Sequence, residues 1–205
     1  TGSFGTTWYV TKSGSDSNTG KSESAAFLTI QKAIDTAVAG DRIIVSDGTY
    51  DPITSANKKV RIESKNGAGK TIINGANKNR CATLGSAVTH RSTTLKGFTL
   101  QNGYVAAKLG GGGSFGGTLI NCLIKNCWSD EYGNGGGVRG GWLYQCIITG
   151  CGLNHNASNT DNYLNGGGAN EARLINCVVA NNDTTSDYHL SVSGASSCQL
   201  ENTIV

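Results

Sequence analysis

A glycine-rich motif is the first stretch of this sequence with the spacing of a chemical site. Gly135, Gly137 and Gly140 spell G-x-G-x-x-G, which binds nucleotide phosphates where it follows a strand and opens a helix. The same spacing occurs 24 residues earlier, within 111–116, and strand-like sequence follows both copies. Two nucleotide-binding sites only 24 residues apart, neither followed by a helix, do not fit this motif. We therefore interpret these glycines as part of a repeated structural unit.

The motif belongs to a repeat that covers the second half of the chain. Glycine triplets recur, and each ends six residues before a leucine. The repeat leucines are 24, 24, 31 and 26 residues apart, at Leu95, Leu119, Leu143, Leu174 and Leu200. All of the length variation falls between the L-x-N-C-like motif and the next glycine. The register of the repeat is therefore fixed, and variable loops connect its copies.

The repeated unit predicts an all-β fold, a parallel β-helix with rungs of about 24 residues. No copy has helical periodicity, and each has short β-branched runs broken by glycine and asparagine. In LINCLI, which starts at Leu119, the alternation of inward and outward side chains requires a bend at Asn121. Asparagine tolerates a left-handed bend. We expect Asn121, Asn176 and Asn202 to form it and their amides to hydrogen-bond along the axis, with Gln145 weakening this ladder.

The chain has seven cysteines, and Cys122, Cys146 and Cys177 share one position of the repeat. A zinc site needs cysteines that converge, whereas residues at one position of a solenoid stack along its axis. Their Cβ atoms would lie about 4.8 Å apart, more than the ~3.8 Å that a disulfide prefers. We therefore expect buried thiols that act as small hydrophobic side chains.

Composition and charge exclude two classes of protein. A formal net charge of +3 over 205 residues gives no electrostatic case for binding nucleic acid. No apolar run approaches the ~20 residues of a membrane-spanning helix. The sequence therefore predicts neither a nucleic-acid partner nor a membrane span in this chain.

The N-terminal part has a different pattern, which predicts a short helix. Thr29 is the expected N-cap and Gly40 the expected C-cap. The residues expected on its apolar face are Ile30, Ala33, Ile34, Ala37 and Val38. Strands are predicted after it, over 42–45, 60–63 and 71–73. Because a solenoid exposes apolar core at its ends, we expect this helix to cap the first rung.

The stretches WYVTKSGSDSNTG and FLTIQKAIDTAVAGDRIIVSDGTY resemble the N-terminus of secreted right-handed parallel β-helix proteins of the pectate-lyase-like superfamily. In that family a G-x-D-x-N-x-G turn precedes the helix, and here its residues are Gly14, Asp16, Asn18 and Gly20. The later repeats resemble those of bacterial surface proteins, including polymorphic outer-membrane and Bacteroidetes proteins. The resemblance implies the fold and a secreted or bacterial cell-surface location. It does not imply one activity, because the superfamily contains lyases, hydrolases, tailspikes and adhesins.

The resemblance to pectate lyases implies one form of active site, in which carboxylates hold calcium and an arginine or a lysine acts as the base. Five carboxylates of the variable loops are candidate calcium ligands: Asp130, Glu131, Asp161, Asp183 and Asp187. A lyase would use Asp161 and Asp183 with Arg139 or Arg173. Nothing in the spacing brings these carboxylates together, so we expect solvated loop residues, with bound calcium as the alternative. The Asp16 turn lacks a glutamate at its twelfth position, and we expect it to be structural.

The variable loops are expected to carry the function. They cover 104–110, 128–134, 152–165 and 183–193, and the fixed register makes them emerge from one edge of the solenoid. Their aromatic, amide and carboxylate groups suit the apolar faces and hydroxyls of sugars. The candidate ligand-binding residues are Tyr104, Trp128, Asp130, Glu131, Tyr132, His155, Asp161, Tyr163, Asp183, Asp187, Tyr188 and His189. The alternative is that the aromatic residues only pack the loops onto the solenoid.

We therefore predict an extracellular bacterial surface β-helix protein with a structural or adhesive role, which binds a glycan or a protein partner through this edge. One alternative is a polysaccharide lyase with calcium-assisted β-elimination, and another is a filament subunit that stacks end to end. We expect one domain over 1–205, with the cap helix and first rung in 1–50, irregular rungs in 51–94 and regular rungs in 95–205. Because the sequence ends in mid-rung, we expect a truncated or open C-terminal end.

Overall fold

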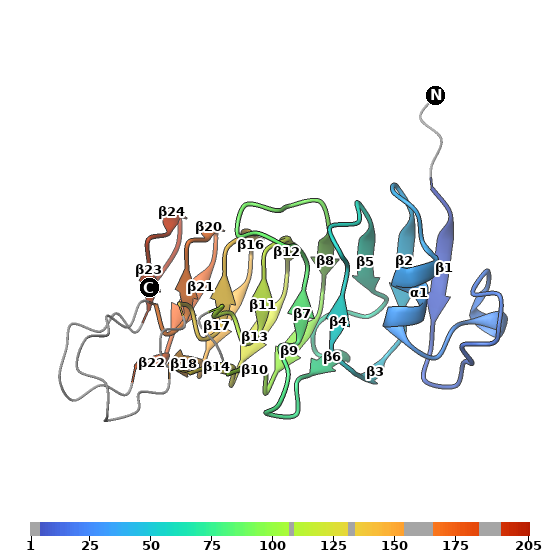
Figure 1. The fold of residues 1–205 in the computed structure, drawn as a ribbon, viewed down its shortest axis with the longest axis horizontal. Coiled ribbons are helices and arrows are strands. Elements are labelled where there is room, and N and C mark those ends of the chain that lie inside the picture. Colours follow the sequence, from blue (N-terminus) through green and yellow to red (C-terminus); the bar gives the residue numbers. More distant parts are fainter. Residues whose placement is uncertain (1–4, 107–108, 131–133, 154–165, 185–193) are drawn as a thin grey trace.

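Short parallel strands wind around one axis in the computed structural model, which describes residues 5–106, 109–130, 134–153, 166–184 and 194–205 (Figure 1). The strands form four parallel sheets of eight, six, six and four strands, which we call sheets A, B, C and D. A regular rung passes through sheets A, B, D and C in that order. The predicted parallel β-helix is confirmed.

Sheet A contains β1 (Thr7–Val10), β2 (Arg42–Val45), β5 (Arg61–Ser64), β8 (Thr94–Lys96), β12 (Thr118–Ile120), β16 (Trp142–Tyr144), β20 (Arg173–Ile175) and β24 (Gln199–Glu201). Sheet B contains β3 (Gly48–Tyr50), β6 (Thr71–Asn74), β9 (Thr99–Gln101), β13 (Leu123–Lys125), β17 (Ile147–Thr149) and β21 (Val178–Ala180). Sheet C contains β4 (Ile53–Thr54), β7 (Ala82–Thr83), β11 (Ser114–Phe115), β15 (Val138–Arg139), β19 (Ala169–Asn170) and β23 (Ala195–Ser196). Sheet D contains β10 (Tyr104–Val105), β14 (Trp128–Ser129), β18 (Gly152–Leu153) and β22 (Asp183–Thr184).

The repeat leucines set the register of the solenoid. They pair with one another along sheet A, and the four from Leu95 to Leu174 are fully buried. Cys122 and Ile124 also point inward, as the bend predicted at Asn121 requires. The core is therefore a set of stacked columns, each contributed by one position of the repeat.

The bend between sheets A and B is left-handed, as the asparagines predict. The φ angles are 51° at Asn121, 53° at Asn176 and 46° at Asn202, and Gln145 adopts the same conformation at 53°. All four side chains are exposed, and in the described part of the chain no hydrogen bond joins them. The expected amide ladder is therefore not formed, and these residues act through their backbone conformation. A second left-handed bend follows sheet B, at Asn102, Asn126, Gly150 and Asn181.

Helix α1 (Ile30–Thr36) lies against the first strands at the N-terminal end of the solenoid (Figure 1). Its predicted N-cap is confirmed, because the Thr29 hydroxyl accepts a hydrogen bond from the Lys32 N–H. The helix ends earlier than predicted, with Ala37 as C-cap. The reason is Asp41, whose carboxylate accepts a hydrogen bond from the Val38 N–H and draws the chain out of the helix. Val38 is consequently 66% exposed instead of lying on the apolar face.

The Asp16 turn is structural. Its Oδ1 accepts hydrogen bonds from the N–H groups of Leu28 and Thr29, each at 2.9 Å, and its Oδ2 accepts one from the Thr29 hydroxyl. Burial acts to raise the pKa of Asp16, but these hydrogen bonds outweigh it and the pKa is lowered. Asn18 donates to the carbonyl of Ala26. The turn thus ties the first strand to the start of the helix.

In the described part of the chain, no helix is long and apolar enough to span a membrane.

The cysteines are free thiols, and Cys122, Cys146 and Cys177 are buried as predicted. Each donates a hydrogen bond to a backbone carbonyl, as Cys146 does to that of Tyr144. A second column contains Cys127 and Cys151, and these thiols lie close to the third glycine of the first two triplets. A Cβ atom on Gly137 would lie 2.6 Å from the backbone oxygen of Gly168 and 3.0 Å from the Sγ atom of Cys151, so only glycine fits between the neighbouring rung and that thiol.

Candidate ligand-binding cleft

The edge that the variable loops were expected to form starts at sheet D. Tyr104, Trp128, Gly152 and Asp183 pair in register there, so the loops start side by side (Figure 1). The Tyr104 hydroxyl donates to Asp130, and this hydrogen bond, with burial, raises the pKa of Tyr104 to about 12. A Cβ atom on Gly152 would lie 2.3 Å from the Trp128 ring. Both aromatic side chains are therefore engaged with their own neighbours at this edge.

The remaining predicted loop residues lie outside the described part of the chain: Glu131, Tyr132, His155, Asp161, Tyr163, Asp187, Tyr188 and His189. Among the residues that the structure describes, no group of three His, Cys, Asp or Glu side chains is placed to hold a metal ion.

The two candidate bases lie on different faces of the solenoid. Arg139 is on sheet C, and its Nε donates to Glu171 at 3.0 Å. Arg173 is on sheet A, and its guanidinium lies 3.3 Å from the Glu201 carboxylate. Asp183 is on sheet D, which does not follow sheet A directly along a rung. The structure therefore does not bring Arg173 and Asp183 together.

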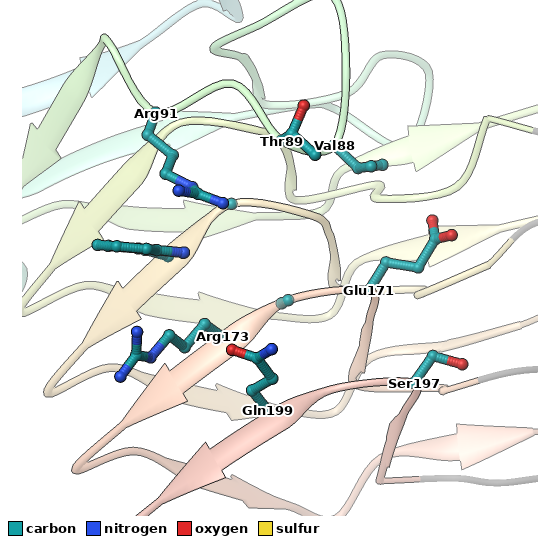
Figure 2. Close-up of a pocket in the computed structure, with 10 residues that line it drawn as sticks. Val88, Thr89, Arg91, Glu171, Arg173, Ser197 and Gln199 are labelled. Carbon is teal, nitrogen blue, oxygen red and sulfur yellow. The ribbon is translucent and has the colours of Figure 1, made fainter.

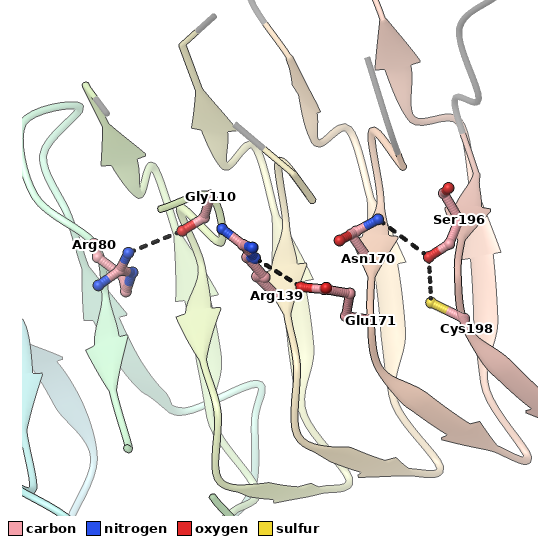
Figure 3. A network of polar contacts seen from close by, with 7 residues as sticks. All are labelled: Arg80, Gly110, Arg139, Asn170, Glu171, Ser196 and Cys198. Carbon is pink, nitrogen blue, oxygen red and sulfur yellow. Dashed lines mark hydrogen bonds and ion pairs between the residues drawn. The ribbon is translucent and has the colours of Figure 1, made fainter. Parts of the chain in front are cut away.

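Arg139 belongs to a row of polar side chains along sheet C (Figure 3). Arg80 starts the row and donates to the carbonyls of Gly110 and Gly111, with its guanidinium 5.0 Å from the Phe115 ring. Burial and the charge of Arg139 lower the pKa of Arg80 to about 10. Arg80 thus fixes the glycine segment before β11, and Arg139 pairs with Glu171 of the next rung.

A cleft on the outer face of sheet A was not predicted. Strands β16, β20 and β24 form its floor, and the segment 84–93 between β7 and β8 forms its wall (Figure 2). Its volume is about 140 Å³, and its lining residues are Val88, Thr89, Arg91, Gly141, Trp142, Glu171, Ala172, Arg173, Ser197 and Gln199. We call it the sheet A cleft.

Paired glycines at the corner between sheets C and A allow the wall to lie where it does. The carbonyl of Val88 accepts a hydrogen bond from Gly141 N–H at 2.8 Å. A Cβ atom on Gly140 would lie 2.4 Å from the Val88 Cα atom, so a larger residue would displace the segment. The next rung has Glu171 and Ala172 at this corner, and both line the cleft. The cleft therefore lies where the glycine pairs end.

Trp142 organises the cationic groups of the cleft. The guanidinium carbon of Arg91 lies 4.2 Å from the centroid of its ring and that of Arg173 lies 5.2 Å away, both within the range of a cation–π interaction. In the part of the chain that the structure describes, the guanidinium of Arg91 has no hydrogen-bond acceptor or carboxylate partner. Figure 2 shows Arg91 on the wall, with Arg173 and Gln199 on the strands opposite. The cleft thus presents guanidinium, amide and hydroxyl groups to a ligand rich in oxygen.

One signal in the sequence could have identified this cleft. The position before each repeat leucine points outward from sheet A, and it is threonine at Thr94 and Thr118. In the next two rungs it is Trp142 and Arg173. A change from a small residue to large aromatic and cationic ones at an outward position indicates a surface that does more than cover the core.

Comparisons with known proteins bear on the fold. A family model described as "Protein of unknown function (DUF1565)" matches residues 12–65, and no curated protein sequence matches the chain. The structure of XylC in complex with xylose has a TM-score of 0.53 at 12% identity, and the match covers 85% of this chain and 53% of that one. A rhamnogalacturonan lyase has a TM-score of 0.48 at 16% identity, with 97% and 62% covered. A pectin methylesterase in complex with a hexasaccharide has a TM-score of 0.45 at 14% identity, with 96% and 78% covered.

These comparisons show the fold alone. The likeness to XylC agrees with the parallel β-helix fold that the resemblance to the pectate-lyase-like superfamily implied. The chain spans 53% of the XylC chain, about half its length. A shared fold does not determine activity, substrate or partners.

Proposed function

We propose that this chain is the glycan-binding part of an extracellular bacterial surface β-helix protein, and that it binds sugar in the sheet A cleft. The observation that carries the proposal is the Arg91 guanidinium, stacked on Trp142 without an acceptor of its own in the described residues. Sugar hydroxyl groups accept hydrogen bonds from guanidinium groups and donate to acceptors such as Glu171 and Gln199, which also line the cleft. The xylose in the XylC complex, which shares the fold, is consistent with this assignment.

The experiment compares two tryptophans that lie on different sheets. Binding of oligosaccharides is measured on a glycan array and then by calorimetry for wild type, Trp142→Ala and Trp128→Ala. Loss of a buried aromatic anchor costs about 2 kcal/mol or more, so Trp142→Ala should weaken binding by roughly 30-fold. Trp128→Ala is the matched control, because it removes the same side chain from sheet D.

Two results would contradict the proposal in different ways. Loss of binding in Trp128→Ala with full binding in Trp142→Ala would move the site to the edge formed by the variable loops. Absence of binding to every glycan tested would reject glycan recognition altogether. Circular dichroism of each variant checks that the solenoid is intact.

The polysaccharide lyase remains the alternative and is tested in the same samples. Acidic polysaccharides are incubated with and without calcium, and the absorbance of unsaturated products is followed. Binding without cleavage is favoured by the ion pair between Arg173 and Glu201 and by the position of Asp183 on another sheet. Calcium-dependent product formation would overturn this part of the proposal.

A further inference from the structure

We infer that two copies of this chain pair side by side through the corner between sheets A and B, with their solenoid axes antiparallel. Two apolar rows lie on either side of the left-handed bend at this corner. Their residues are Ile120, Tyr144 and Ile175 on sheet A and Leu123, Ile147 and Val178 on sheet B. We call these six residues the corner surface. The pairing does not depend on a ligand in the sheet A cleft.

The corner surface is an outward-facing apolar patch. Its members occupy the same positions in three successive rungs and pair from strand to strand. Ile147 at its centre is 47% exposed, and the other five side chains are half-buried. The segment 84–93 lies against Trp142, two residues before Tyr144, and lines the sheet A cleft without lining the corner surface. Apolar side chains gathered in this way on an outward face indicate a contact with another protein.

The outward row on sheet A identifies a second copy of the chain as the partner. Along the solenoid this row reads Lys96, Ile120, Tyr144, Ile175 and Glu201, each in register with the next. A two-fold axis that runs along β16 reverses this order in the second copy, so that Lys96 faces Glu201 of the second copy. Ile120 likewise faces Ile175, and Tyr144 faces its own counterpart. The row is therefore complementary to itself.

The same row disfavours parallel solenoids. With a two-fold axis along the solenoid, Lys96 would face its own counterpart and so would Glu201, and like charges in contact are destabilising. The bend between the sheets has the symmetry of the antiparallel arrangement, because Gln145 lies between Asn121 and Asn176. The amides of these three residues are exposed, and each can donate and accept a hydrogen bond. Amide can therefore pair with amide across the axis.

Both charged ends of the row can take a further partner. Glu63, on the strand before Lys96, already pairs with two arginines. In the part of the chain that the structure describes, Lys96 forms no ion pair of its own. Glu201 pairs with Arg173 through its Oε2 atom and is 56% exposed, which leaves Oε1 for a second cation. Contact between Lys96 and Glu201 of the second copy therefore breaks no existing pair.

Sedimentation velocity over a series of protein concentrations tests the pairing. Wild type should show an equilibrium between monomer and dimer. Ile147→Lys places two charges in an apolar contact and should raise the dissociation constant by roughly 100-fold. Val38→Lys is the matched control and should leave the equilibrium unchanged, since Val38 is an aliphatic residue that is 66% exposed beside the cap helix. Circular dichroism checks that each variant is folded.

Charge reversal tests the orientation. Lys96→Glu and Glu201→Lys should each weaken the dimer by roughly 10-fold, because each replaces two attractive contacts with two repulsive ones. The double variant, which combines the two changes, should dimerise like wild type. A zero-length carbodiimide crosslink should also join Lys96 to Glu201. Within one chain these residues lie about 19 Å apart at ~4.8 Å per strand, so this crosslink can form only between copies.

Three results would overturn the inference. The first is a wild-type protein that stays monomeric up to about 100 µM. The second is a dimer that Ile147→Lys leaves intact, because another surface then forms it. The third is a dimer that neither charge reversal weakens and that gives no crosslink between Lys96 and Glu201, because the solenoids are then not antiparallel. If Ile147→Lys does not fold, the two charge reversals give the same decision, since they leave the apolar rows unchanged.

Discussion

The middle glycine of the second triplet offers a direct test of how the rungs pack. A Cβ atom on Gly136 would lie 2.0 Å from the carbonyl oxygen of Gly152 and 2.6 Å from that of Gly167. Both oxygens belong to the backbone, in sheet D and in the following rung. Gly136→Ala therefore forces apart two segments that neighbouring hydrogen bonds hold in place.

The expected cost follows from two contributions. Overpacking a well-packed core costs about 1–3 kcal/mol. Displacing Gly136 also strains its hydrogen bonds, which run to Gly166 at 3.2 Å and from Gly112 at 2.8 Å and are each worth about 1 kcal/mol. We expect Gly136→Ala to lower the free energy of unfolding by about 3–5 kcal/mol.

The assay is urea unfolding followed by circular dichroism, with Gly69→Ala as control. A Cβ atom on Gly69 meets nothing within 4 Å, so this change should be neutral or stabilise by less than about 1 kcal/mol. If Gly136→Ala unfolds at the same urea concentration as Gly69→Ala, with an unchanged slope, then the rungs are not packed as closely as the structure indicates.

Two further predictions concern stability. Burial acts to raise the pKa of Asp41, but hydrogen bonds from Trp8, Val38 and Thr6 outweigh it and lower the pKa below 3.8 in the folded protein. The ionised Asp41 carboxylate therefore stabilises the fold fully above pH 3.8, and this stabilisation is lost as the pH falls further. Asp41→Asn should cost about 2 kcal/mol at neutral pH in urea unfolding, and the difference from wild type should shrink in acid; a constant difference would contradict the assignment. Asn121→Val should destabilise by about 1–2 kcal/mol because a β-branched residue resists a φ of 51°, while Asn121→Gly should be nearly neutral; equal effects in the same assay would show that the bend is not the reason for asparagine.

The repeat made the architecture predictable. Its leucines, glycines and asparagines recur at fixed spacings, and each spacing reports a local constraint such as an inward side chain, a close approach or a left-handed bend. Thr29 was predictable as a cap for the same reason, since its partner Lys32 is three residues away. The end of α1 was not, because it depends on a hydrogen bond from Val38 to Asp41 that competes with continued helix.

The candidate site, unlike the architecture, was not predictable from the sequence. The sequence placed the functional side chains in the variable loops, and the structure confirms that the loops start side by side on sheet D. It did not indicate that Arg91 would stack on Trp142, because the two residues belong to different rungs and to different kinds of segment. Their contact exists only because the segment 84–93 crosses the glycine corners at Gly117 and Gly141.

The sequence by itself determined the solenoid, its register, its capping helix and the burial of Cys122, Cys146 and Cys177, because these depend on residues that are close in the chain or repeat along it. The tertiary structure decided which part of the outer face of sheet A is covered by the segment 84–93. That choice places Arg91 over Trp142 and so creates the sheet A cleft. Contacts that repeat from rung to rung produce a periodic pattern in the sequence. A contact that is made only once between two rungs produces no such pattern.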